Sequence, residues 1–172
     1  RHQRRPARRP VTRPPAWSTP DANPVSSARP DELDDARVRR WIERTVPRDR
    51  RATPQVGSNE DRYLASIGLL ALEGRTWHPT VAAMTLAGRR PELHIPGCAL
   101  VGEVDGERIH LAGTISDILR ALDTSPARSF DMHLLLEVVL NAFLHRDWSE
   151  HAPIELCARA DRLEVSNPGH LT

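Results

Sequence analysis

Residues 129–146 constrain the fold of this chain more than any other segment. Apolar side chains occur on nearly every side of a helical wheel drawn for this segment, which predicts a long, buried helix. Glu137, Asn141 and His145 interrupt the apolar pattern at intervals of four residues, so they share one face of the helix. Because burial of polar groups without partners is costly, this face must meet water, a ligand, a metal or another part of the chain.

Two strands and a turn are predicted directly after the helix. Residues 154–159 and 163–165 form the strands, and residues 167–169, with the sequence Asn-Pro-Gly, form the turn. A helix with Glu and Asn four residues apart, followed by a hairpin and a glycine-containing turn, is typical of a nucleotide site. The carboxylate can orient water, the amide oxygen can bind Mg²⁺, and the glycine lets the backbone approach a base. Periodicity alone favours a plainer interpretation, a solvent-exposed polar strip on an otherwise buried helix.

The end of the predicted helix allows two further interpretations. Arg146 and Asp147 are expected to tie the helix end to the loop that follows. His145, Asp147 and His151 are close enough in sequence to be considered as metal ligands, but no other His or Cys occurs at ligand spacing. The sequence therefore favours the structural role over the metal site.

Residues 135–149 and 161–169 together resemble a bacterial and archaeal family of transcriptional regulators. Members of that family join a Schlafen-type AlbA-like DNA-binding domain to a C-terminal histidine-kinase-like ATPase domain, which is often described as RecG-like. The asparagine-bearing helix combined with the sequence Asp-Arg-Leu-Glu-Val-Ser-Asn-Pro-Gly carries the resemblance. In weaker form it extends over residues 31–172, including residues 79–91 and 113–122.

The resemblance implies a role for four residues. Glu137 corresponds to the base that orients the hydrolytic water, and Asn141 corresponds to the magnesium ligand. Asn167 stands where these ATPases usually carry an adenine-reading aspartate, and Gly169 where the following glycine lets the backbone approach the base. An asparagine amide oxygen can still accept a hydrogen bond from the adenine amino group, but the charge-assisted contact is lost. ATP and Mg²⁺ are the cofactors that the resemblance implies.

The second glycine-rich phosphate loop of that family, and the strands that close its site, have no counterpart before Thr172. We therefore expect residues 1–172 to bind nucleotide weakly and without hydrolysis, and ATPase activity to require a longer chain. The predicted function is the ATP-binding part of a DNA-associated transcriptional regulator. The alternative is a non-enzymatic DNA-binding or interaction scaffold with a degenerate ATPase-like fold, which the Arg-rich start of the chain and the helical segments within residues 31–72 motivate.

The predicted fold class is α+β, with a small helical region and a β-hairpin followed by the N-terminal part of a histidine-kinase-like ATPase α/β sandwich. Residues 1–30 are rich in Arg and Pro, so we expect them to be disordered. Residues 31–123 are expected to form the helical and hairpin region, and residues 124–172 the incomplete ATP-binding domain. The elements predicted in the middle region are a helix over 31–46, a helix that starts at Ser58, includes Leu70 and closes at Gly74, a short helix over 80–88, a hairpin that turns at Asp105 and Gly106, and a helix from Thr114 to Leu122.

Charge and composition limit the partners of the chain. A net charge of +1 argues against a nucleic-acid binder with a uniformly basic surface, although DNA stays a candidate partner beside a nucleotide. No segment is long and apolar enough to cross a bilayer, so no membrane partner is expected. Cys98 and Cys157 lie far apart and are expected to be free thiols in a reducing, cytoplasmic environment. An oligomer is compatible with the sequence but is not indicated by it.

Overall fold

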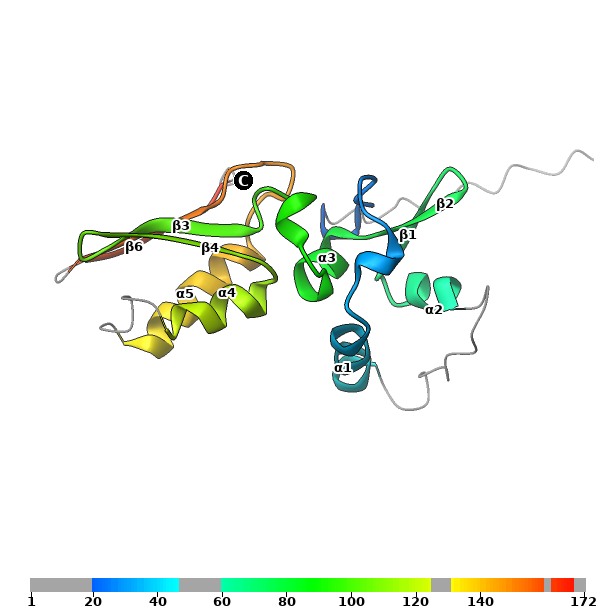
Figure 1. Cartoon of the computed structure of the whole chain (residues 1–172), viewed down its shortest axis with the longest axis horizontal. Helices are drawn as coiled ribbons and strands as arrows, with labels where there is room; N and C mark the ends of the chain where they lie inside the picture. Colours follow the sequence, from blue (N-terminus) through cyan, green and yellow to red (C-terminus); the bar gives the residue numbers. More distant parts are fainter. Residues whose placement is uncertain (1–19, 47–59, 125–130, 160–161, 169–172) are drawn as a thin grey trace, which may run out of the picture.

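The computed structural model describes residues 20–46, 60–124, 131–159 and 162–168. These residues form a mixed α+β structure with a two-stranded antiparallel sheet and a four-stranded mixed sheet, which confirms the predicted fold class. The two sheets lie at opposite ends of the molecule, and short helical elements lie between them (Figure 1).

The N-terminal part contains mostly short elements. They are the 3-10 turns η1 (Pro20–Ala22), η2 (Pro30–Glu32) and η4 (Pro91–Leu93), the helices α1 (Asp35–Thr45), α2 (Glu60–Ser66) and α3 (Val81–Ala87), and the strands β1 (Leu70–Glu73) and β2 (Thr76–Pro79). The short helix predicted over residues 80–88 is confirmed. The Thr80 side chain caps it by accepting a hydrogen bond of 3.1 Å from the Ala83 amide, and it ends at Gly88.

The C-terminal part contains the larger sheet and two helices. Its elements are β3 (Ala99–Val104), β4 (Glu107–Ala112), α4 (Ile115–Leu122), α5 (Met132–Leu144), β5 (Ile154–Arg159) and β6 (Arg162–Ser166). The hairpin predicted at Asp105 and Gly106 is confirmed, and both turn residues have positive φ angles of 47° and 88°. Thr114 caps α4 as predicted, and it is fully buried.

The larger sheet has the strand order β4-β3-β5-β6, and β3 pairs with β5 in parallel. Helices α4 and α5 cover one face of this sheet, and no described element covers the other face (Figure 1). The side chains between the helices and the sheet form the C-terminal core, which consists of Leu100, Val104, Ile115, Ile118, Leu122, Leu135, Val139, Phe143, Ile154, Leu156 and Ala158.

This sheet crosses the predicted boundary between the middle region and the ATP-binding domain. Residues 99–112 were assigned to the middle region, yet β3 pairs with β5 over Leu100–Val104 and Ile154–Ala158. A parallel pair needs a long connection, and here α4 and α5 lie within it. The described residues therefore group by core into 20–98 and 99–168.

Two predictions for the N-terminal part are wrong. Residues 20–30 belong to the segment predicted to be disordered, but Val25 and Ala28 are buried in the N-terminal core and the Val25 amide donates to the Pro79 carbonyl at 2.8 Å. Leu70 was predicted on a helix, but it lies on β1 and pairs with Pro79. Tertiary contacts thus override the local pattern in both segments. Residues 1–19 and Ser58 lie outside the described residues.

A partly buried network joins the N-terminal part to the C-terminal part. The Arg37 guanidinium on α1 donates to both carboxylate oxygens of Asp117 on α4, at 2.6 and 2.9 Å, and to the Thr114 hydroxyl at 2.7 Å. Burial raises the pKa of Asp117, but the hydrogen bonds from Arg37 and Thr114 together lower it by more than burial raises it. The net pKa therefore lies below the usual value.

Replacing Asp117 with asparagine is expected to lower the free energy of unfolding by about 1–2 kcal/mol at neutral pH, because the ion pair with Arg37 is lost. Since the pKa of Asp117 is lower in the folded protein, its contribution is present above the unfolded carboxyl pKa and disappears as the pH falls through the folded pKa. Urea unfolding at neutral and strongly acidic pH measures how much of the free energy of unfolding is lost on acidification. This loss should be smaller in Asp117→Asn than in the unsubstituted protein.

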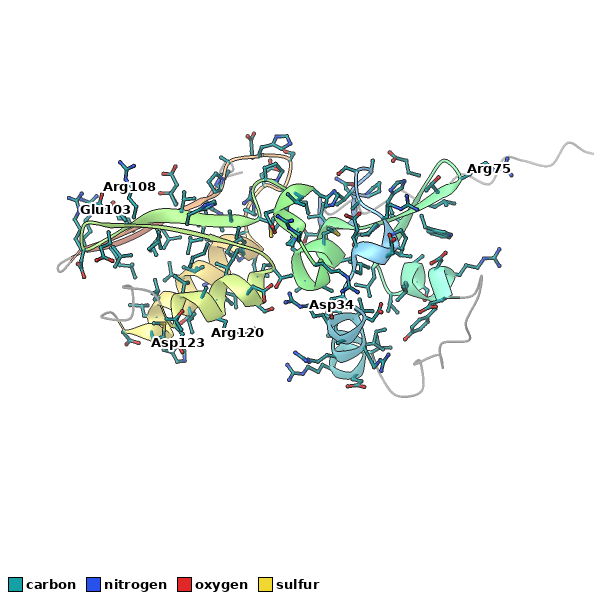
Figure 2. All side chains as sticks on the ribbon, viewed as in Figure 1. Asp34, Arg75, Glu103, Arg108, Arg120 and Asp123 are labelled. Atoms are coloured by element: carbon teal, nitrogen blue, oxygen red, sulfur yellow. The ribbon has the colours of Figure 1, made fainter. Side chains whose placement is uncertain are left out.

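The matched control for Asp117 is Asp123→Asn, at the exposed C-terminal end of the same helix (Figure 2). This variant should retain the acid dependence of the unsubstituted protein. If both variants lost the same free energy of unfolding on acidification, the contact between Arg37 and Asp117 would not stabilise the connection between the N-terminal and C-terminal parts.

No helix among the described residues has the length and apolar character that crossing a membrane requires.

Candidate functional site

Helix α5 buries one face and exposes the face that carries the predicted site. Leu135, Val139 and Phe143 are buried against the sheet, whereas Glu137 and Asn141 are exposed. The expectation that the helix is buried on all sides is wrong, because Leu134 and Leu144 on its outer side are 52% and 60% exposed. The polar stripe therefore meets solvent and has no desolvation cost that a ligand must offset.

The turn predicted to read adenine is attached to the C-terminal end of α5. The Asn167 side-chain nitrogen Nδ2 donates to the Ala142 carbonyl at 3.3 Å, and the Asp147 amide donates to the Pro168 carbonyl at 3.0 Å. Asn167 is exposed, and its donor nitrogen is engaged with the helix, so Oδ1 is the side-chain atom that can accept from a ligand. Gly169 lies outside the described residues.

The structure thus brings three of the four predicted site residues onto neighbouring elements. Glu137 and Asn141 lie one turn apart on the exposed side of α5, and Asn167 lies beside the last turn of the same helix. An exposed amide oxygen such as that of Asn141 can take part in a magnesium shell that consists mainly of water and phosphate oxygens.

Arg146 and Asp147 tie the end of α5 to the following loop, as predicted. The Arg146 guanidinium donates to the carbonyl oxygens of Gly97, Glu150 and Ala152, the last two at 2.8 and 3.0 Å. The Asp147 carboxylate accepts from the amide and the hydroxyl of Ser149, at 2.8 and 2.6 Å. Arg146 is 4% exposed, and this burial lowers the pKa of its guanidinium below the ordinary value.

The alternative metal site at His145, Asp147 and His151 does not form. In the part of the chain that the structure describes, no three His, Cys, Asp or Glu side chains come together in an arrangement that could hold a metal ion. Cys98 is also unsuited to thiolate chemistry at neutral pH, because burial raises its pKa to about 12.

A hollow on the described surface does not coincide with the predicted site. It has a volume of about 640 Å³ and lies on the sheet face away from α4 and α5, where its lining includes Glu103, Arg108, Glu155 and Cys157. Figure 2 shows Arg108 on the opposite side of the sheet from Arg120 on α4. Because this hollow is open and lacks Glu137, Asn141 and Asn167, we do not assign the nucleotide site to it.

A second polar arrangement was not predicted from the sequence. The Ser27 hydroxyl lies 3.0 Å from Nδ1 of His94, and Nε2 of His94 lies 2.9 Å from the Glu32 carboxylate. Ser27 and His94 are 67 positions apart, and Glu32 and His94 are 62 apart. No local spacing links these residues, so only the folded chain reveals the arrangement.

No family model, curated protein or solved structure matches this chain. A functional assignment therefore depends on the residues described above and on the sequence resemblance.

Proposed function

We propose that the outer face of α5 and the adjoining turn at Asn167 form part of a nucleotide-binding site, in a protein that acts as a DNA-associated transcriptional regulator. The observation that carries this proposal is the pair of hydrogen bonds that attach Asn167 and Pro168 to the end of α5. These bonds hold the turn beside a helix whose exposed face carries a carboxylate and an amide, which supports a role for the turn in reading the base.

The residues fit Mg²⁺ and ATP in chemical type. Asn141 supplies a neutral oxygen ligand, and its exposed position lets the ion keep several water molecules and bind phosphate oxygens. Glu137, one turn earlier, supplies a carboxylate that can accept a proton from a water molecule. The Asn167 amide oxygen can accept a hydrogen bond from the amino group of adenine. ATP would contribute the phosphoryl group, and these side chains would bind and orient it.

The expected affinity is low. None of the three side chains is buried, and each exposed hydrogen bond to a ligand competes with water. A single amide ligand also leaves most of the magnesium shell to water and phosphate. The chain is therefore expected to bind ATP without turning it over.

Replacing Asn141 with alanine is expected to weaken Mg²⁺-dependent ATP binding by about tenfold or more, because the protein loses its proposed magnesium ligand. Isothermal titration calorimetry with ATP, in the presence and absence of Mg²⁺, measures this change. The control is Glu155→Ala, an exposed residue on the other face of the sheet, which should leave the affinity unchanged.

An Asn141→Ala variant with unchanged affinity would contradict the nucleotide site. The non-enzymatic alternative would then gain support if the chain bound DNA in a salt-sensitive manner. Exposed arginines on α1, namely Arg39, Arg40 and Arg44, are the residues among the described part that favour this alternative, because they can contact phosphates.

A further inference from the structure

Ser27, His94 and Glu32 form a chain of hydrogen bonds from three separate segments. Ser27 occupies a central position of the turn that the Ala28 amide closes on the Val25 carbonyl at 2.8 Å. His94 follows η4, and Glu32 ends η2. The serine hydroxyl contacts one ring nitrogen of His94 at 3.0 Å, and the carboxylate contacts the other at 2.9 Å. These distances lie within the range over which a base can activate a nucleophile.

The carboxylate determines which ring nitrogen of His94 carries the proton. The Glu32 oxygen Oε2 accepts a hydrogen bond of 2.7 Å from the Arg29 amide, and Oε1 contacts His94. The Arg29 bond is the main reason that the pKa of Glu32 lies below its usual value, and the contact with His94 lowers it further. An ionised carboxylate only accepts hydrogen bonds, so Nε2 of His94 must donate to it.

A neutral imidazole with a proton on Nε2 has a lone pair on Nδ1. The Ser27 hydroxyl therefore donates to Nδ1, which is the direction that removal of the serine proton requires. Ser27 is exposed, whereas the His94 side chain is only 13% exposed. The Ser27 hydroxyl is thus accessible to a ligand, whereas the His94 ring that would act as its base is mostly buried.

We propose that Ser27, His94 and Glu32 constitute a nucleophilic site that hydrolyses short, uncharged carboxylic esters. The role of each residue follows from its contacts: in serine hydrolases a histidine between a hydroxyl and a carboxylate serves as the base, and here the ring is reversed, with Nδ1 toward the hydroxyl and Nε2 toward the carboxylate. This activity is independent of the proposed nucleotide site on α5.

A cavity of about 370 Å³ adjoins the serine and accounts for the ester class. Ser27 and His94 line it, and Val25, Val81, Ile95 and Trp148 contribute apolar wall. This volume lies near the lower end of the range for small-molecule sites, so it suits a short acyl group. Glu150 also lines the cavity, and its negative charge disfavours anionic esters.

The reaction balances with water as the only co-reactant. The Ser27 oxygen bonds to the ester carbonyl carbon as its proton passes to Nδ1 of His94. The bond to the alkoxide leaving group then breaks, and His94 returns the proton to that alkoxide. A water molecule next attacks the acyl group on Ser27 and gives one proton to His94, which restores the serine hydroxyl as the carboxylic acid leaves. Glu32 keeps its hydrogen bond to Nε2 throughout.

A fluorophosphonate probe tests the nucleophile directly, because it bonds covalently to an activated serine oxygen and releases fluoride. We expect intact-mass analysis to show one label per chain and peptide mapping to locate it on Ser27. Ser27→Ala should abolish the label. Ser66→Ala is the control, since Ser66 is also an exposed serine but lies on α2, outside the lining of the cavity, and this variant should be labelled on Ser27 as the unsubstituted protein is.

His94→Asn is expected to slow labelling by about 100-fold, because the general base is removed. Hydrolysis of p-nitrophenyl acetate by the full chain should fall in parallel in Ser27→Ala and His94→Asn but not in Ser66→Ala. Circular dichroism would verify that each variant is folded. Absence of label in the folded, unsubstituted protein, or equal loss of label in Ser66→Ala and Ser27→Ala, would overturn the proposal.

Glu32 is a positioning residue, so its test needs a readout other than rate. The ¹⁵N chemical shifts of the His94 ring should identify Nε2 as the protonated nitrogen in the unsubstituted protein. In Glu32→Gln the amide can donate as well as accept, so the shifts should move toward a mixture of tautomers and labelling of Ser27 should slow. Unchanged ring shifts together with unchanged labelling would mean that Glu32 does not orient the base.

Discussion

Replacing Phe143 with alanine is expected to lower the free energy of unfolding by about 3–5 kcal/mol. The Phe143 side chain is 1% exposed and lies between α5 and the sheet in the C-terminal core. Its ring also stacks on Trp148, with the ring centroids 6.4 Å apart and the planes inclined by 24°. Alanine would leave a cavity bounded by paired strands, which cannot move inward without loss of their hydrogen bonds.

The control for Phe143 is its neighbour Leu144, which is 60% exposed. Leu144→Ala should change the free energy of unfolding by no more than about 0.5 kcal/mol, because it removes few packing contacts. Chemical denaturation monitored by circular dichroism measures both values. Similar losses in the two variants would mean that α5 does not bury the face that carries Leu135, Val139 and Phe143.

Elements with strong local signals could be predicted from the sequence. A capping threonine precedes both α3 and α4, and the Asp105-Gly106 pair fixes the turn between β3 and β4. In each case the residues that specify the structure lie within a few positions of the element. The conformation therefore depends little on the rest of the chain.

Segments whose conformation depends on distant contacts were predicted poorly. Residues 20–30 contain few apolar side chains, yet Val25 and Ala28 pack in the N-terminal core with residues of α3 and β2. No local sequence pattern reveals these contacts. Leu70 continues the apolar pattern of the preceding helix, so a helix was predicted there. Backbone pairing with Pro79 instead makes Leu70 part of β1. The parallel pairing of β3 with β5 has the same character, since about fifty residues separate the partners Leu100 and Ile154.

The candidate site was predictable only in part for a related reason. Four-residue spacing correctly puts Glu137 and Asn141 on one face of α5, because helical geometry alone determines it. Whether that face is buried depends on the sheet, which packs against Leu135 and Val139 instead. The contact between Asn167 and Ala142 likewise requires β6 to return along α5. The role of the site in nucleotide binding stays a prediction.

Replacing Arg146 with alanine is expected to lower the free energy of unfolding by about 3–5 kcal/mol, because three backbone carbonyl oxygens would lose a charged hydrogen-bond donor. The side chain is 4% exposed, and its guanidinium donates to the carbonyl oxygens of Gly97, Glu150 and Ala152. The guanidinium carbon also lies 4.5 Å from the centre of the Trp148 ring. These contacts join the end of α5 to the segment that precedes β3, so both cores lose a connection at once.

Two substitutions distinguish the contribution of the planar guanidinium of Arg146 from that of its charge and from the effect of removing any surface arginine. Arg146→Lys keeps the charge but replaces a planar group with a compact ammonium, so it should recover only part of the lost stability. Arg159→Ala removes an arginine whose side chain is 65% exposed, and it should change the free energy of unfolding by no more than about 0.5 kcal/mol. Equal stabilities of the Arg146→Ala and Arg159→Ala variants would exclude the proposed connection.

Gly97 offers a test of the contact itself. A Cβ atom at this position would lie 2.2 Å from Nη2 of Arg146, so Gly97→Ala must displace the guanidinium from its carbonyl partners. In the unsubstituted protein this change should therefore be destabilising, whereas in an Arg146→Ala background the same methyl group meets no guanidinium and should cost less. A double-mutant cycle measures the difference as a coupling free energy. Independent effects of the two substitutions would show that Arg146 does not pack against Gly97.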